Sequence, residues 1–164
     1  MTDLTKKGQP NKVVWSEVHN QAFQKLKGVL CSDAVLKLPD LHQPFIIRTD
    51  ASNRGLGAVL LQEDEGLEKP VAYASRKLLP RECNYSTIER ECLGIVWGIL
   101  KFQKYLYGKE FKLETDHLPL QWLQQKKSTN SRLMRWALSL QPYRLAVRYI
   151  KGNENVGADY LSRV

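Results

Sequence analysis

The sequence predicts an α/β fold built on one mixed β-sheet. Three runs of alternating apolar and polar residues lie between residues 45 and 78, separated only by short turns, as in an antiparallel meander. A strong helical pattern and another strand follow over residues 84–116. This strand, helix, strand order places the later strand parallel to one already in the sheet. With 164 residues, 43% of them hydrophobic, the chain is long enough for one such domain with a buried core.

The first elements along the chain each have a local reason. Residues 1–15 are polar and contain glycine and proline, which predicts a flexible lead, and apolar residues at helical spacing predict a helix over 17–30. The run 45–50 is apolar on both faces, as expected for a strand in the middle of a sheet. A tight turn leads to a second strand over 55–62, and an acidic turn leads to a third over 69–78.

The clearest helix is predicted over residues 84–108. Ser86 and Glu89 form a capping box at its start, an apolar stripe follows, and Gly108 ends it. The remaining predicted elements complete the order βββαβααβα: a strand over 110–116, helical segments over 118–125 and 130–141, a strand over 143–152 and a short final helix.

Charge and composition narrow the function classes. The net charge is +8, and residues 117–164 carry eight Lys or Arg against two Asp or Glu. This local excess favours a polyanion partner, usually nucleic acid, although a basic surface can also serve solubility alone. No apolar run approaches the ~18 residues of a membrane span, no secretory signal is visible, and three cysteines without CxxC spacing indicate neither a disulfide framework nor a zinc site. We therefore expect an intracellular protein without membrane association.

Two predicted strands end on the same dipeptide. FIIRTD stops at Asp50 and FKLETD stops at Asp116, each with a threonine before the acid. If the two strands are parallel neighbours, both carboxylates emerge at the carboxyl edge of the sheet, where ligands bind in open sheets. Two carboxylates held that close repel each other unless a pKa rises or a cation lies between them, which favours a divalent ion such as Mg²⁺.

Other acids are candidates for the same cluster. Glu89 has a structural role in the capping box, whereas Glu91 shares a helical face with Gly94 and Gly98, a smooth face that would let the helix lie close to the sheet. The fourth candidate is Asp159 in NENVGADYLSR, which taken alone would be interpreted as a surface acid near a helix start.

These landmarks together resemble one family. TDAS and GLGAVL, then VAYASRKL and NYSTIERE, then LETDHLPLQWL, and finally YIKGNENVGADYLSR resemble, in this order, the ribonuclease H domain of gypsy-type LTR-retrotransposon reverse transcriptases. By this resemblance, residues 41–164 are identified as the RNase H domain. Residues 1–40 are identified as a lead and helix that link it to the polymerase thumb of a longer polyprotein.

The resemblance implies both a fold and an active site. The fold is RNase H-like, with a five-stranded mixed sheet in the order 3-2-1-4-5 flanked by helices. The family's four acids fall on Asp50, Glu91, Asp116 and Asp159; Glu91 is preferred to Glu89 because the family's acid directly precedes a short apolar run. These acids would be the catalytic residues and the ligands of two Mg²⁺ ions, which Mn²⁺ could replace, with Asp50 as the bridge.

The implied activity is that of an endoribonuclease. It would hydrolyse the RNA strand of RNA–DNA hybrids during reverse transcription and leave a 3′-hydroxyl and a 5′-phosphate. Its partners would be the hybrid and the polymerase domain of the same polyprotein, in the cytoplasm or in a virus-like particle. Many cellular ribonucleases H carry a histidine in the loop before the last acid; the KGNENVGAD loop of this chain has none.

Substrate contacts are expected from two groups of residues. Hydroxyl and backbone groups would recognise the 2′-hydroxyls of RNA across its minor groove, and arginines would hold phosphates. The residues are Ser52, Asn53, Ser86 and Thr87 for the first group, and Arg132 and Arg135 for the second. The competing interpretation is a catalytically silent RNase H-like module that binds nucleic acid or braces a polymerase; all four acid positions are filled, which favours the enzyme. The oligomeric state stays open.

Overall fold

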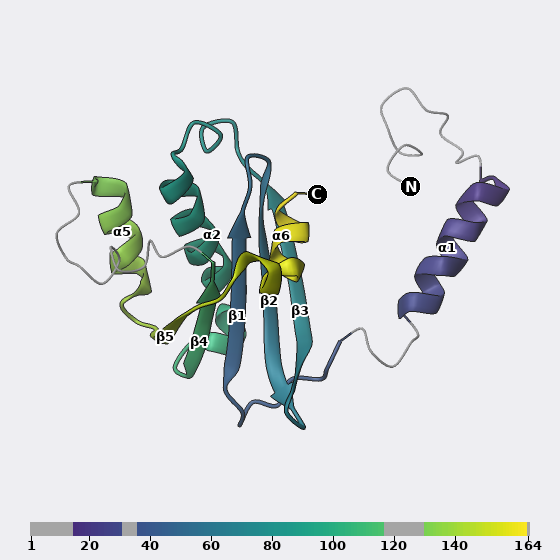
Figure 1. Cartoon of the computed structure of the whole chain (residues 1–164), viewed down its shortest axis with the longest axis horizontal. Coiled ribbons are helices and arrows are strands. Elements are labelled where there is room, and N and C mark those ends of the chain that lie inside the picture. Colours follow the sequence, from purple (N-terminus) through teal and green to yellow (C-terminus); the bar gives the residue numbers. More distant parts are fainter. Residues whose placement is uncertain (1–14, 31–35, 117–129, 164) are drawn as a thin grey trace. The chain divides into compact units, whose positions relative to one another are not determined.

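A five-stranded mixed sheet forms the centre of residues 36–164 in the computed structural model (Figure 1). Its strands lie in the order β3-β2-β1-β4-β5; the first three are antiparallel, and β1, β4 and β5 run parallel to one another. The predicted α/β class and strand order are therefore confirmed. The strand bounds are β1 Phe45–Ala51, β2 Gly55–Asp64, β3 Leu67–Lys77, β4 Glu110–Thr115 and β5 Arg144–Tyr149.

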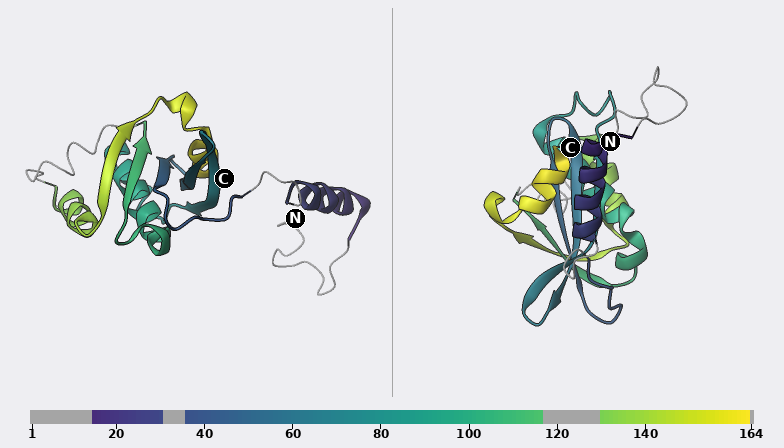
Figure 2. Two further views of the ribbon diagram at one scale, coloured as in Figure 1. Left: turned by 90° about the horizontal axis from the view of Figure 1, so that it is seen from below. Right: turned by 90° about the vertical axis from the view of Figure 1, so that its right-hand side faces the viewer.

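Helices lie on both faces of this sheet (Figure 2). One face packs against α2 (Thr87–Lys101), α3 (Gln103–Leu106) and α5 (Ser131–Leu140). The other face packs against α6 (Val156–Ser162), which follows the 3-10 turn Gly152–Glu154. The carboxyl ends of β1 and β4 therefore form an edge of the sheet that residues from helices on either face can approach.

The central strand β1 is buried on both faces, as its sequence predicts. Phe45 and Ile47 belong to the main core cluster with Ile99 of α2, whereas Ile46 packs against Ala158 of α6. Successive side chains of a strand point to opposite faces, so the two helix layers meet different residues of the same strand.

The structure describes residues 15–30, 36–116 and 130–163. The chain divides into two compact units, Met1–Val35 and Leu36–Val164, a few residues before the predicted boundary at residue 40. Lys37 and Asp40 belong with the sheet: the Lys37 N–H donates to the Pro70 carbonyl oxygen at 2.7 Å, and the Asp40 N–H donates to Gln62 Oε1 at 2.9 Å.

The first unit contains α1 (Glu17–Leu30), the helix predicted there. Its apolar side chains are exposed: Val18, Phe23, Leu26 and Val29 have exposed fractions between 45% and 73%. The assignment of this region as a link from a polymerase stays a prediction.

Glycines allow both helix layers to lie close to the sheet. A Cβ on Gly98 would lie 2.9 Å from Thr49 Cγ2, and one on Gly94 would lie 3.4 Å from the Asp50 carbonyl oxygen, so the smooth face predicted for α2 is confirmed. Gly57 of β2 is under tighter constraint, because a Cβ there would overlap the carbonyl oxygen of Ala158. The backbone of α6 therefore rests directly on β2.

Several predicted elements differ in extent: β2 runs two residues further than predicted, β5 is shorter at both ends, and two other differences have a local cause. The helix predicted over 84–108 is interrupted at Phe102, whose backbone (φ −101°, ψ 16°) departs from helical geometry while its ring is buried, so α3 begins as a separate turn. β3 begins at Leu67, because Glu65 and Gly66 both adopt positive φ and close a tight hairpin. The helical segment predicted over 118–125 lies outside the described residues. Within those residues, no helix is long and apolar enough to cross a membrane.

Substitution of Gly57 by alanine should destabilise the sheet unit, which is the second compact unit, Leu36–Val164. The added methyl group would meet the backbone of α6 rather than a mobile side chain, and overpacking of this kind lowers the free energy of unfolding by about 1–3 kcal/mol. Chemical denaturation followed by circular dichroism measures the change. The matched control is Gly28→Ala in α1, where nothing lies within 4 Å of an added Cβ. Equal stability of the parent and Gly57→Ala chains would contradict the close packing of α6.

Candidate active site

Asp50 and Asp116 lie at the same edge of the sheet because β1 and β4 are parallel neighbours. Arg48 pairs with Glu114 in the register of the two strands, so the two acids, each two residues further along, are level with each other. Thr49, which precedes Asp50, points the other way and contacts the glycine face of α2. The repeated Thr-Asp ending is thus explained by parallel pairing: the threonine faces the core and the acid emerges at the edge.

The third acid, Glu91, is carried by α2. Ser86 caps α2, and the glycine face of α2 lies close to β1. Glu91 therefore lies beside the end of β1, with an exposed fraction of only 5%. The backbone of Ala51 favours the charged form of Glu91, but burial outweighs it and raises the pKa of this carboxyl group. The capping box thus sets where the helix begins, and Glu91 follows within its first two turns.

The fourth acid, Asp159, is carried by α6, which hydrogen bonds fasten to the strands. In each bond a side chain on one element donates to a backbone carbonyl on another, so the attachment does not depend on charge. The three bonds are Asn155 Nδ2 to Thr49 O at 3.0 Å, Ser52 Oγ to Ser162 O at 2.6 Å, and Ser75 Oγ to Leu161 O at 2.6 Å.

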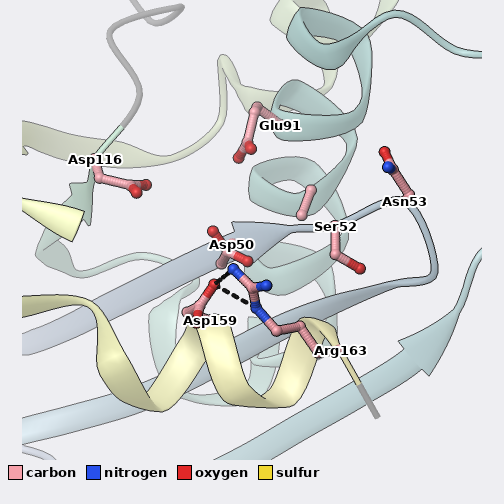
Figure 3. Close-up of a pocket in the computed structure, with 8 residues that line it drawn as sticks. Asp50, Ser52, Asn53, Glu91, Asp116, Asp159 and Arg163 are labelled. Carbon is pink, nitrogen blue, oxygen red and sulfur yellow. Dashed lines mark hydrogen bonds and ion pairs between the residues drawn. The ribbon is translucent and has the colours of Figure 1, made fainter. Parts of the chain in front are cut away.

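The four acids line one hollow of about 320 Å³, together with Ser52, Asn53 and Arg163 (Figure 3). Figure 3 shows the carboxylates of Glu91 and Asp116 directed toward Asp50, with Asp159 on α6 facing them. The structure therefore brings together all four acids that the sequence singled out.

Burial and repulsion between carboxylates favour protonation of two acids of this cluster, Glu91 and Asp50. Burial, followed by the charges of Asp50 and Asp116, raises the pKa of Glu91 from 4.5 to about 8. Burial also raises the pKa of Asp50; the Ser162 hydroxyl opposes this, the charges of Asp116 and Asp159 add to it, and Arg163 lowers it. A site of this kind holds protons that ordinary carboxyl groups release, and it gains from any cation that lets the carboxylates ionise.

The donor set fits a hard divalent cation. All four candidate ligands are carboxylates, which Mg²⁺ prefers, and Oδ1 of Asp116 is buried without a hydrogen-bond partner among the described residues. Within those same ranges, no three Asp, Glu, His or Cys side chains already have a metal-ligating arrangement. Mg²⁺ ligation by these acids therefore stays a prediction.

Two of the predicted substrate contacts, Ser52 and Asn53, lie at the hollow. The Ser52 hydroxyl is used by the protein itself: it donates to the Ser162 carbonyl oxygen and accepts from the N–H groups of Arg54 and Gly55. Asn53 is exposed at the tip of the same turn. Ser52 thus fastens the β1–β2 turn to α6, and Asn53, like Arg54, is exposed on this turn.

Ser86 and Thr87 lie at the start of α2, outside the residues that line the hollow. Ser86 Oγ accepts from the Glu89 N–H at 3.3 Å while Glu89 Oε2 accepts from the Ser86 N–H at 2.9 Å, which confirms the predicted capping box. The backbone hydrogen bond from Ser86 is the largest of the interactions that lower the pKa of Glu89 to about 2. The structural role assigned to Glu89, and the choice of Glu91 for the cluster, agree with this geometry.

Arg132 and Arg135 lie on α5, also away from the hollow. Arg132 Nη1 donates to Glu89 Oε1 at 2.6 Å, and its guanidinium lies 4.0 Å from the centre of the Tyr85 ring, so this arginine joins α5 to the start of α2. Arg135 is exposed. A phosphate-binding role for Arg132 would compete with these contacts.

Three neighbours of the acids were not singled out from the sequence. Asn155 positions α6, a Cβ on Gly152 would lie 3.2 Å from Asp116 Oδ2, and Arg163 Nε donates to Asp159 Oδ1 at 2.8 Å. The available signal was spacing: Asn155 and Arg163 lie one helical turn before and after Asp159 in NENVGADYLSR.

Solved structures share the fold at low sequence identity. A foamy viral protease-reverse transcriptase in complex with an RNA/DNA hybrid superposes with a TM-score of 0.61 at 20% identity, over 92% of this chain and 21% of that one. The N-terminal RNase H domain of a Mycobacterium tuberculosis protein, studied as a fusion with maltose binding protein, gives a TM-score of 0.58 at 18% identity, over 74% and 91% of the two chains. These likenesses establish the RNase H-like fold.

Sequence comparison gives the family. Residues 40–143 match the RNase H-like domain found in reverse transcriptase. The chain is 45% identical to the retrovirus-related Pol polyprotein from transposon 297 of Drosophila melanogaster and 43% identical to that from transposon gypsy of the same organism. The alignments cover 88% and 92% of this chain but only 13% and 14% of the two polyproteins. The chain therefore belongs to the RNase H-like domains found in reverse transcriptases and, as its motifs predict, to the gypsy-type retrotransposon members among them.

Proposed function

We propose that this domain is a metal-dependent endoribonuclease that hydrolyses the RNA strand of RNA–DNA hybrids during retroelement reverse transcription. The observation that carries the proposal is the convergence of four carboxylates, from β1, α2, α6 and the end of β4, on one hollow. Burial and repulsion raise the pKa of two of these acids, which costs stability in the absence of a cation. Perturbed carboxyl groups gathered in a hollow are typical of a catalytic site.

The chain's own residues have defined roles in this reaction. Asp50, Glu91, Asp116 and Asp159 would hold the divalent ions. Glu91 and Asp116 point toward Asp50, which supports the expectation that Asp50 would be the ligand shared by the ions. Bound Mg²⁺ would lower the pKa of the attacking water and stabilise the departing 3′ oxygen. The water oxygen forms its bond to phosphorus as the bond to the 3′ oxygen breaks, which leaves a 3′-hydroxyl and a 5′-phosphate without a covalent enzyme intermediate.

The proposed substrate is supported by charge and by the solved neighbours. The basic excess of the chain suits a polyanion. Two structural neighbours, the foamy viral enzyme and LC11-RNase H1, were solved in complex with an RNA/DNA hybrid. Among the predicted contacts, Asn53 lines the hollow, and Thr87 and Arg135 are exposed, so these three side chains can reach a bound duplex. Arg132 would contribute by holding α5 against α2.

The proposed partner is the polymerase domain of the same polyprotein. The relatives are Pol polyproteins, of which this chain matches a small part. The cytoplasm or a virus-like particle is the location that we propose for such a protein.

Asp50→Asn should abolish cleavage while the fold is kept. The substitution preserves volume but removes a negatively charged ligand from the centre of the cluster, so the single-turnover rate should fall by about 100-fold or more. The rate is measured on a labelled RNA–DNA hybrid with Mg²⁺ at low salt, alongside single-stranded RNA and duplex DNA. The parent chain should cut only the RNA strand of the hybrid.

Asp64→Asn is the matched control, because Asp64 lies at the far end of β2 in ion pairs with Lys37 and Lys69. This variant should cleave at the parental rate. Residual activity of Asp50→Asn within tenfold of the parent would contradict the assignment of the acids. Hybrid binding by the parent without cleavage, in Mg²⁺ or Mn²⁺, would favour the catalytically silent module.

The stability of the metal-free chain should fall as the pH rises from about 5 to about 8. The folded-state pKa of Glu91 lies above its unfolded value, so its stabilising contribution is complete below the unfolded value and is lost as the pH passes through about 8. Thermal melting in the presence of a chelator measures this loss. Saturating Mg²⁺ should raise the melting temperature more at pH 8 than at pH 5, because a cation binds the ionised carboxylates.

Glu91→Gln should flatten this pH profile, since the amide does not titrate. The control Glu110→Gln changes an exposed acid at the opposite end of β4 and should leave the profile as it is. An equal Mg²⁺ shift at both pH values would show that the ion binds elsewhere.

A further inference from the structure

Arg163 lines the acid hollow from the end of α6, and its hydrogen bonds are asymmetric. Both Nε, at 2.8 Å, and Nη2 donate to the same oxygen of Asp159, Oδ1 (Figure 3). The second carboxylate oxygen of Asp159 therefore stays outside this ion pair.

Arg163 also interacts electrostatically with Asp50. Figure 3 shows the guanidinium between the carboxylates of Asp50 and Asp159, and the attraction between Arg163 and Asp50 favours the charged form of each group. One guanidinium thus offsets repulsion between two members of the cluster that would hold a cation.

The guanidinium is not locked in this position by packing. The Arg163 side chain is 68% exposed and its partner Asp159 is 40% exposed. Arg163 also lines a neighbouring hollow of about 390 Å³, together with Ser52, Asn53 and Arg54. A rotation about its side-chain bonds can therefore move the charge from one hollow to the other without disturbing the core.

We propose that Arg163 is the resident counter-ion of the acid cluster, and that a divalent cation bound by Asp50 and Asp159 displaces its guanidinium into the neighbouring hollow. The inference rests on the proposed metal-dependent function and adds that the guanidinium of Arg163 competes with the metal ion for these carboxylates. An ion of charge +2 among the same carboxylates is attracted more strongly than the guanidinium and repels it, so the two cations exclude each other.

The test is the affinity of the full chain for Mg²⁺ alone, measured by isothermal titration calorimetry at low salt without nucleic acid. Arg163→Gln should bind Mg²⁺ about three- to tenfold more tightly than the parent, because the competitor is gone. Arg163→Lys, which keeps the charge, should lie closer to the parent. The charge-matched control is Arg144→Gln, an exposed position at the amino end of β5, and it should leave the affinity unchanged.

A merely structural arginine predicts the opposite sign. If Arg163 served to orient Asp159 as a ligand, Arg163→Gln would bind Mg²⁺ more weakly, and either this result or an unchanged affinity overturns the proposal. The parent chain gives a second readout that needs no variant: the Nε–H resonance of Arg163 in a ¹⁵N spectrum should be that of a hydrogen-bonded group with a chelator and of a solvent-exposed one with Mg²⁺. An unaltered resonance at saturating Mg²⁺ overturns the proposal as well.

These measurements separate the inference from the proposed function. If the parent chain binds Mg²⁺ and cleaves the hybrid but Arg163→Gln shows no gain in affinity, only the displacement of Arg163 is wrong. If the parent chain neither binds Mg²⁺ nor cleaves, the metal-dependent function and the inference fail together.

Discussion

The parallel pairing of β1 with β4 is the constraint on which the site depends. Parallel strands in register end at the same edge, so acids at the carboxyl ends of two strands distant in sequence meet there; an antiparallel partner would carry Asp116 to the opposite edge. Parallel pairing also requires a crossover, and the crossover helix α2 carries Glu91 to the same edge. One topological feature therefore places three of the four acids.

The fourth acid depends on how closely α6 approaches the sheet. Gly57 removes the side chain that would hold the helix away, and Asn155, buried at the start of α6, bonds to the backbone of β1 next to Asp50. Neither attachment is ionic, so the position of Asp159 is set by packing and hydrogen bonds that do not change as the carboxylates titrate or bind a cation. The contacts that hold α6 against the sheet therefore do not depend on the negative charge of the cluster.

Acids elsewhere in the sheet unit show what a structural carboxylate looks like in this fold. Glu114 is fully buried, and its two oxygens accept from Arg48 at 2.7 Å and Arg148 at 3.2 Å, so three strands are joined by compensated charge. In the hollow, by contrast, Asp50, Asp116 and Glu91 act on one another as like charges. The acids of the hollow lower the stability of the fold, although the nearby Glu114 is stabilised by ion pairs. Such a cluster is expected at a functional site.

The sequence by itself predicted most of the elements, their order and the four acids that line one hollow. These predictions rest on interactions between residues close in the chain, such as the capping box of Ser86 with Glu89, and on motifs whose order is linear. Only the tertiary structure decided which polar groups were already engaged. Ser52 and Arg132, predicted to contact substrate, bond to Ser162 and Glu89, whereas Arg163, overlooked in the sequence, lies among the acids. The physical reason is that the partners of a side chain across a packed interface come from segments distant in sequence. A local sequence pattern does not indicate which of these segments lie next to each other in the fold.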